Sequence, residues 1–241
     1  NLDKYDNFLN DTTDEGYPRL GNPDAPVSVV EYSSFSSSGC LSFHDDIFPA
    51  LLPRVESGEI NFVFVPLQTG SVPNPEGASR TAICAGEQGQ FWQMHDVLFF
   101  WHGTYVNSAF QDGRIRTGVQ ELGLNTADFN RCFNSNSTNA VLTAAQNEGI
   151  ASTPTITVNG APVAGTLDAI NTAIDNNLPA SGSFEPGIID AETTDTQDVN
   201  DEVENAEDVS DETDGESTED TEVEESAEDT ETSEESEDEE S

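Results

Sequence analysis

The acidic residues of this chain are distributed too unevenly for a single folded object. Of the 48 Asp and Glu residues, 28 lie in residues 181–241, where there is no Lys or Arg. Residues 1–180 hold the other 20 and all 7 basic residues, so the net charge of −41 divides into −28 and −13. The last segment has one aromatic residue, Phe184, and cannot bury enough apolar surface to offset the entropy of ordering. We therefore expect a folded domain before residue 181 and a disordered acidic tail at 181–241.

This charge restricts the classes of partner. Nucleic acid and anionic membrane surfaces are disfavoured because they carry the same sign of charge, whereas the tail is suited to cations or basic partners. No run of 18 apolar residues occurs, so we expect no membrane span in this chain. The chain opens with Asn1 and shows no signal-peptide pattern. We expect an extracytoplasmic protein, exported to the cell surface or secreted, whose export signal or N-terminal membrane anchor has been removed.

The first half of the folded part has the pattern of a β-α-β unit. Two β-branched or aromatic runs, Val27–Tyr32 and Ile60–Leu67, are typical of buried strands. Between them, residues 40–55 carry apolar residues at helical spacing. A crossover through a helix makes the two strands parallel. The polar residues 1–20 are expected to form an N-terminal arm.

The second half predicts a helical block followed by a hairpin and a last helix. The hairpin consists of Thr155–Val158 and Ala161–Ala164 around the turn pair Asn159-Gly160. Such an order predicts an α/β fold in which a mixed sheet is interrupted by a helical insertion at about 70–150. The helices are expected at 78–88, 91–101, 115–122, 140–147 and 166–178.

The loop before the first helix holds a candidate reactive residue, Cys40. Backbone N–H groups at a helix N-terminus favour a thiolate, so a lowered pKa is one reading of this position. A buried cysteine packed beneath the sheet is the other, because free cysteine is among the most buried residue types.

Several short sequence motifs follow one another along the chain. They are GNPDAPVS (21–28), VEY (30–32), FSSSGCLSFH (35–44), CAGEQG (84–89) with FWQMHD (91–96), and TP (153–154) with VNG (158–160). Together they resemble the DsbA-like thiol-disulfide oxidoreductases of the thioredoxin superfamily. The resemblance implies that residues 21–180 form a thioredoxin fold with an inserted helical domain, in a protein that works outside the cytoplasm.

The chain departs from that family at the residue that does the chemistry. Members carry Cys-Pro-x-Cys at the start of the first helix, and in this register Ser37 replaces the nucleophilic cysteine, Ser38 the proline, and Cys40 matches the second cysteine. A serine hydroxyl cannot form a disulfide, so Ser37 and Cys40 cannot cycle as a dithiol pair. Whether the chain is an enzyme stays open at this point.

Three interpretations of Cys40 remain. It is a structural relic, a working monothiol that forms a mixed disulfide or a sulfenic acid, or one half of a pair made with another cysteine after movement. The structural interpretation is placed first.

Two further pairs of residues are candidates for a role, the first from the resemblance and the second from its own spacing. Thr153-Pro154 matches the cis-proline site at which the family offers its backbone to an extended substrate, and X-Pro bonds are the ones readily cis; an ordinary trans proline is the alternative. Cys84 and Cys132 lack metal-ligand spacing, and an exported chain more often pairs two such cysteines in a structural disulfide. Two packed free thiols are the alternative.

The three histidines are scattered, and we expect His95 and His102 to be structural. We expect His44 to be a partly exposed helix residue; the alternative is that it adjusts the pKa of Cys40, one helical turn before it. We expect no metal and no cofactor, because the sequence shows no ligand cluster and no phosphate loop. Three functions are compatible with these observations. The first is an accessory module with a degenerate Ser-x-x-Cys site that binds protein or peptide, the second a monothiol oxidoreductase that uses Cys40, and the third a structural subunit of an extracellular or cell-surface assembly.

Overall fold

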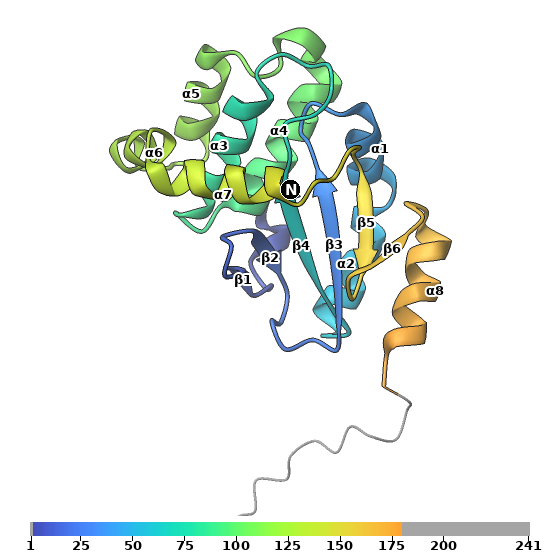
Figure 1. Cartoon of the computed structure of the whole chain (residues 1–241). Coiled ribbons are helices and arrows are strands. Elements are labelled where there is room, and N and C mark those ends of the chain that lie inside the picture. Colours follow the sequence, from blue (N-terminus) through green and yellow to red (C-terminus); the bar gives the residue numbers. More distant parts are fainter. Residues whose placement is uncertain (1, 180–241) are drawn as a thin grey trace, which may run out of the picture. The chain divides into compact units, whose positions relative to one another are not determined.

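The computed structural model describes residues 2–179, and the acidic tail predicted at 181–241 lies outside them. The described residues form an α/β fold around a six-stranded mixed sheet of order β1-β2-β4-β3-β5-β6 (Figure 1). In this sheet β3 and β4 are parallel, as predicted from the helical connection between them, and the other pairs are antiparallel. The strands are β1 (Asn10–Thr12), β2 (Pro18–Leu20), β3 (Val27–Ser33), β4 (Ile60–Pro66), β5 (Thr155–Val158) and β6 (Ala161–Val163).

The two central strands differ in how they are covered. Every residue of β4 is buried, so the continuous apolar run predicted its position well. In β3, buried and half-buried residues alternate, and Val27, Val29 and Glu31 share the buried face. A carboxyl group therefore lies on the inner face of a central strand.

The helix expected over residues 40–55 is two helices, α1 (Ser38–Asp46) and α2 (Phe48–Glu56). Pro49 lies in the first turn of α2. Because proline has no N–H to donate to the carbonyl four residues earlier, it ends one helix and is well accommodated at the start of the next. Ile47 is the junction between the two.

A helical block is inserted between β4 and β5, and Figure 1 shows α3, α5 and α6 gathered beyond one end of the strands. The helix over 126–133 was not predicted, because it is short and polar on its outer side. The chain ends its described part in α8 (Leu167–Asn177). The inserted helices are α3 (Pro75–Gly86), α4 (Phe91–Tyr105), α5 (Asp112–Glu121), α6 (Thr126–Phe133) and α7 (Asn136–Asn147), with a 3-10 turn, η2 (Val106–Ser108), after α4.

The N-terminal residues do not form the separate arm that their polarity suggested. A 3-10 turn, η1 (Leu2–Tyr5), is followed by β1 and β2, and β2 pairs with β4 at the edge of the sheet. Leu20 in β2 is fully buried. The short strands escaped prediction because each has only three residues.

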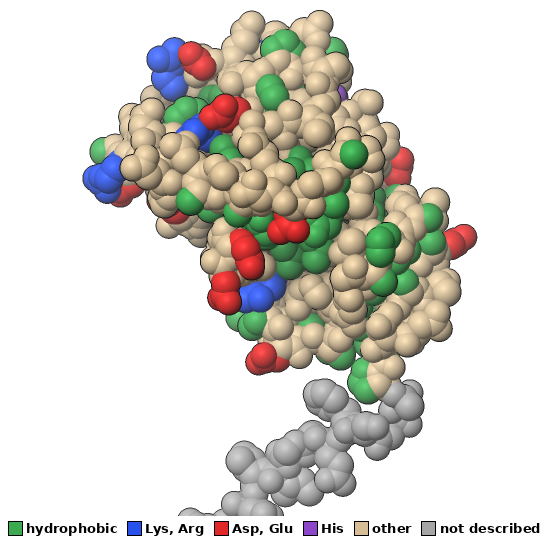
Figure 2. Space-filling model, viewed as in Figure 1, with side chains coloured by type: hydrophobic (Ala, Val, Ile, Leu, Met, Phe, Trp, Pro, Cys, Tyr) green, Lys and Arg blue, Asp and Glu red, His purple; other side chains and the backbone are tan. Residues whose placement is uncertain are grey.

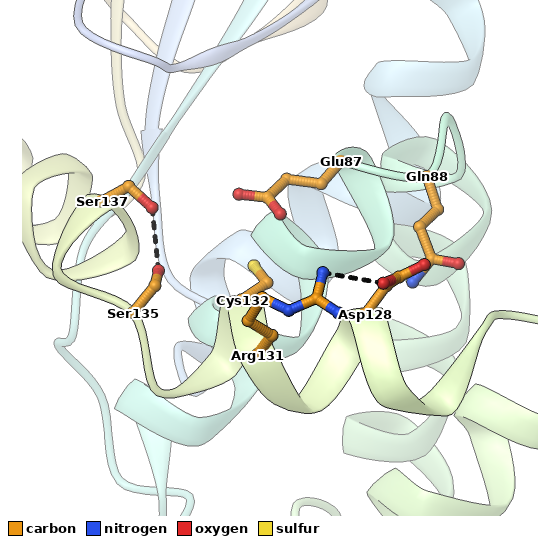
Figure 3. A pocket seen from close by; sticks show the side chains of 7 residues that line it. All are labelled: Glu87, Gln88, Asp128, Arg131, Cys132, Ser135 and Ser137. Carbon is orange, nitrogen blue, oxygen red and sulfur yellow. Dashed lines mark hydrogen bonds and ion pairs between the residues drawn. The ribbon is translucent and has the colours of Figure 1, made fainter. Parts of the chain in front are cut away.

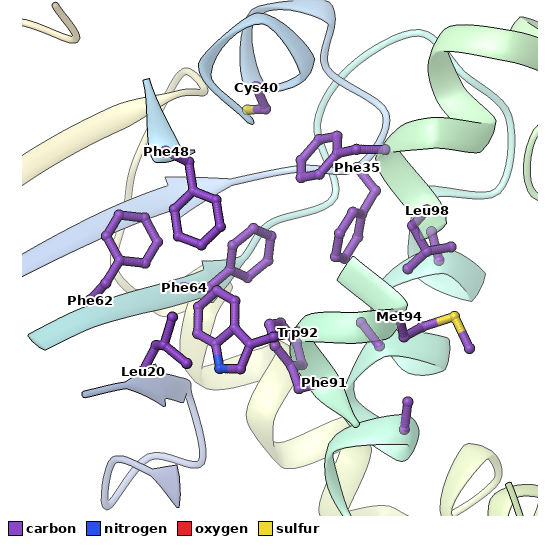
Figure 4. Close-up of a cluster of buried hydrophobic side chains, with 14 of the residues drawn as sticks. Leu20, Phe35, Cys40, Phe48, Phe62, Phe64, Phe91, Trp92, Met94 and Leu98 are labelled. Atoms are coloured by element: carbon purple, nitrogen blue, oxygen red, sulfur yellow. The ribbon is translucent and has the colours of Figure 1, made fainter. Parts of the chain in front are cut away.

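The main core lies between the sheet and α4. Figure 4 shows Phe35, Phe62 and Phe64 from the β-α-β unit facing Phe91 and Trp92 from α4. Ring centroids of Phe64 and Phe91 are 5.5 Å apart. Phe91 and Trp92 of α4 therefore belong to a core shared with the sheet.

A smaller cluster covers the opposite face of the sheet. It joins Tyr17, Val63, Val65 and Leu67 to Ala145 of α7. Figure 2 shows hydrophobic side chains gathered across the middle of this face, below α7, with carboxylates around them. Within residues 2–179, no helix combines the length and the apolar character needed to cross a membrane.

Candidate functional site

Helix α1 begins at Ser37, whose side chain connects two distant parts of the chain. Ser37 is the N-cap, with extended backbone angles, and its Oγ accepts a hydrogen bond from the Cys40 N–H at 3.4 Å. The same hydroxyl donates to the carbonyl oxygen of Thr153 at 3.3 Å. The structure thus brings Ser37 beside the segment that precedes β5.

That segment contains a cis peptide bond between Thr153 and Pro154. A Cβ atom on Gly39 would lie 2.9 Å from Cδ of Pro154, so the first turn of α1 approaches the proline as closely as only glycine allows. The Thr153 hydroxyl lies 2.6 Å from the Thr69 hydroxyl. Three loops therefore meet at Thr153.

The loop that carries Thr69 is joined to the loop before α1 by its backbone. Ser34 Oγ donates to the Thr69 carbonyl at 2.6 Å, and the Ser71 N–H donates to the Ser36 carbonyl at 3.1 Å. Gly70 has a φ of 103°, and a Cβ there would lie 2.2 Å from the Ser36 oxygen. This close backbone contact holds the geometry of the site.

Cys40 faces the protein interior. Its residue is 0% exposed, and its Sγ accepts a hydrogen bond from the Ser34 N–H at 3.4 Å. Burial, and after it the nearby Glu31 carboxyl, raise the pKa of the Cys40 thiol, and they outweigh the hydrogen bonds that favour a thiolate. At Cys40, burial therefore has a larger effect on the pKa of the thiol than the position at the helix N-terminus.

Glu31 is a site residue that the sequence reasoning missed. Burial raises the pKa of its carboxyl to about 8, against the hydrogen bond that Ser33 Oγ donates to Oε1 at 2.7 Å. The sequence did indicate that Glu31 is buried, because it alternates in phase with the buried positions Val27 and Val29 of β3. An acid on the inner face of a strand is uncommon without a partner.

A second polar cluster lies between α1 and α4, where His44, His95 and Asp96 meet. Their donor atoms all lie within 4.8 Å of one another, so these three side chains are a conceivable set of metal ligands. Asp96, however, already accepts a hydrogen bond from Tyr5 and forms an ion pair with Lys4 at 2.8 Å. We interpret the cluster as a hydrogen-bonded junction. His102 is also structural, since its Nδ1 lies 2.7 Å from the carbonyl oxygen of Phe35.

Comparison with known proteins places this arrangement in a family. The family model described as thioredoxin matches residues 13–176. The chain belongs to the thioredoxin family. Within that family it is similar to DsbA-like proteins and to protein-disulfide oxidoreductases.

The chain is 27% identical over 167 residues to a putative protein-disulfide oxidoreductase of Rickettsia conorii, and the alignment covers 66% of this chain and 59% of that relative. It is 35% identical over 92 residues to disulfide bond formation protein D of Bacillus subtilis, covering 35% of this chain and 39% of the relative. The matched part thus spans less than two thirds of the length of each of these proteins.

Solved structures show the same fold. BdbD from Bacillus subtilis, in its oxidised form, aligns with a TM-score of 0.58 at 22% identity, over 70% of this chain and 97% of that one. Wolbachia pipientis alpha-DsbA1 aligns with a TM-score of 0.54 at 19% identity, over 66% and 88%.

The disulfide of this DsbA-like thioredoxin lies in its helical block, away from Ser37. Cys84 of α3 and Cys132 of α6 are bonded, with Cα atoms 5.6 Å apart. Cys132 lines a pocket of about 460 Å³, and Figure 3 shows it beside Glu87 and Arg131. Both cysteines are in the last turns of their helices, where the partial negative charge of the helix end opposes a thiolate. The surroundings thus favour a structural bond over an exchanging one.

Proposed function

We propose that this DsbA-like protein binds extended polypeptide beside Ser37 and Pro154 and does not turn over as a dithiol oxidase. It would do so outside the cytoplasm. The observation that carries the proposal is the state of the three cysteines in the chain. Two of them are bonded to each other, and the third, Cys40, is free and buried.

Dithiol exchange needs an accessible thiolate that attacks and a second thiol that resolves the mixed disulfide. In this chain the position next to Pro154 is taken by the Ser37 hydroxyl, and Cys40 is 0% exposed. Burial also raises the pKa of the Cys40 thiol. These three properties weigh against a monothiol reaction at Cys40 as well.

Binding is supported by the frame around Thr153. Its hydroxyl is held by Thr69 and the following proline by Gly39, so the backbone before β5 is presented in one orientation. A pre-ordered backbone lowers the entropic cost of pairing with an extended chain. The Rickettsia conorii relative is named as acting on protein disulfides, which agrees with a polypeptide as ligand.

The redox part is tested by a gain of function. Insulin reduction by dithiothreitol is followed with wild type, Ser37→Cys, Ser37→Ala, Cys40→Ala and Ser37→Cys/Cys40→Ala. We expect no acceleration by wild type or by Ser37→Ala, acceleration by Ser37→Cys, and its loss in the double variant. Acceleration by wild type that disappears in Cys40→Ala would overturn the proposal in favour of monothiol catalysis.

The binding part is tested by fluorescence anisotropy with a labelled insulin B chain whose thiols are blocked with iodoacetamide. We expect saturable binding to the full chain and competition by unlabelled B chain. Absence of binding to wild type and to every Ser37 variant would refute it.

A further inference from the structure

We infer that the Ser37 hydroxyl occupies the backbone acceptor that a bound polypeptide needs, so that this chain competes with its own ligand at Thr153. The inference rests on the proposed function and concerns how the same site is regulated.

The hydroxyl of Ser37 has one proton, and that proton is already used in a hydrogen bond. It donates to the Thr153 carbonyl at 3.3 Å, while a lone pair on the oxygen accepts from the Cys40 N–H at 3.4 Å. Ser37 is only 8% exposed, so the hydroxyl cannot turn to water without losing a protein partner. Leaving such a group unpaired is costly.

Thr153 cannot move away from Ser37 without disturbing its other contacts. Its hydroxyl is bonded to that of Thr69 at 2.6 Å, and Pro154 packs against Gly39. A carbonyl oxygen has two lone pairs, and the Ser37 proton uses the one on the side where the proposed peptide lies, beside Ser37 and Pro154. A peptide N–H that approaches Thr153 from that side must displace the Ser37 proton.

A cysteine at position 37 would not close the site in this way, since a thiol is a weak hydrogen-bond donor. Serine at this position therefore has two effects. It removes a nucleophile, and it adds a stronger donor aimed at the acceptor beside Pro154. The second effect makes the affinity for peptide depend on a single proton.

The expected change in peptide affinity corresponds to the free energy of one neutral hydrogen bond. Removing the competing donor should tighten peptide binding about three- to tenfold. Affinity should rise only for ligands that offer a backbone N–H to Thr153, and blocking that N–H by N-methylation in the probe should cancel the gain.

The experiment measures binding of the labelled, thiol-blocked insulin B chain to full-length variants by anisotropy. Ser37→Ala removes the donor, and Ser37→Asp removes it while keeping a helix cap for the Cys40 N–H. Ser37→Thr keeps a hydroxyl, and Ser38→Ala is the matched control at the exposed next residue. We expect tighter binding in the first two, and wild-type affinity in the other two.

The outcomes separate this inference from the proposed function. If wild type binds and both Ser37→Ala and Ser37→Asp bind equally well, the competition is refuted while peptide binding stands. If no variant binds, both are refuted. Thermal unfolding of each variant shows whether a weaker signal reflects loss of folded protein, and Ser37→Asp keeps the test decisive if Ser37→Ala is unstable.

Discussion

Nε2 of His44 lies 3.0 Å from Oδ1 of Asp96, and this contact joins α1 to α4. The same carboxylate accepts from the Tyr5 hydroxyl at 2.8 Å and pairs with Lys4 at 2.8 Å, which ties η1 to both helices. Burial opposes ionisation of Asp96, but hydrogen bonds from His44 and His95 prevail and hold its pKa well below its usual range. One side chain therefore secures the helix that begins at Ser37.

Replacing Asp96 should destabilise the fold more than any surface carboxylate. For Asp96→Asn we expect the free energy of unfolding to fall by about 2–3 kcal/mol, because a half-buried cation and two histidines lose their anionic partner. Urea unfolding at pH 7 measures this. The control is Asp128→Asn, whose exposed pair with Arg131 should contribute less than about 1 kcal/mol. Equal effects of the two variants would contradict the role of Asp96.

His95 should make the protein less stable in acid. Burial lowers the pKa of His95 to about 4, whereas the same imidazole has a pKa of about 6.5 in the unfolded chain. Between these values the unfolded state binds the proton and the native state does not, so stability falls as the pH falls from about 6.5 to about 4. The free energy of unfolding, measured across this range for wild type and His95→Gln, should show a steeper loss in wild type. Parallel curves would argue against a neutral buried His95.

Glu31 should make the protein less stable as the pH rises, which is the opposite of the effect of His95. The pKa of its carboxyl is about 8 in the folded state, which is above the value of about 4.3 in the unfolded chain. The native state therefore holds a proton that the unfolded state has lost, and the stabilising contribution disappears as the pH rises towards about 8. We expect Glu31→Gln to be more stable than wild type at pH 9, by at most about 5 kcal/mol at about 1.4 kcal/mol per pKa unit. A difference that does not grow between pH 5 and pH 9 would disprove this.

Gly70 should tolerate no side chain. Its φ is 103° and an added Cβ would lie 2.2 Å from the Ser36 carbonyl oxygen, so Gly70→Ala must separate the two loops. We expect a loss of more than about 2 kcal/mol. Gly89→Ala is a matched control, because Gly89 has a φ of 76° with nothing within 4 Å, and it should cost about 1 kcal/mol. Thermal unfolding of both variants separates backbone strain from steric overlap.

The Cys84–Cys132 bond should stabilise the domain without taking part in exchange. It closes a loop with a sequence separation of 48, for which the chain-entropy argument gives about 4 kcal/mol. The Cys84→Ser/Cys132→Ser variant should lose about that amount, and dithiothreitol should then have no further effect on it. Insulin reduction by the Ser37→Cys variant should be unchanged when both serines are added, at a temperature where the protein stays folded. Loss of activity there would assign the bond a redox role.

Much of the fold was predictable because its central elements have strong patterns. The continuous apolar run of β4 and the Asn159-Gly160 turn of the β5–β6 hairpin are signals that depend on few neighbours. The edge strands β1 and β2 were missed because three residues are too few for a period, and their pairing with β4 is a tertiary effect. The break at Ile47 was visible in principle, since Pro49 lies four residues after Asp45.

The site was only partly predictable. Ser37, Thr153 and Pro154 were named from the order of short motifs, and the structure places them together. The direction in which Cys40 points could not be read from its position, because a helix N-terminus and a buried face make opposite demands on a thiol. Thr69 gave no signal at all, since its role comes from a loop that reaches Thr153 only in the folded chain.

The position of β3 in the sheet sets an order for folding. One of its edges pairs with β4, which follows soon after it, but the other pairs Val29 with Val158 of β5. As the chain is made from its N-terminus, the whole helical block and both bonded cysteines emerge before that second edge is covered. An open strand edge is a template for pairing with other chains. This edge of β3 therefore stays unpaired until residue 158 has been made, and a chain that stops before β5 never covers it.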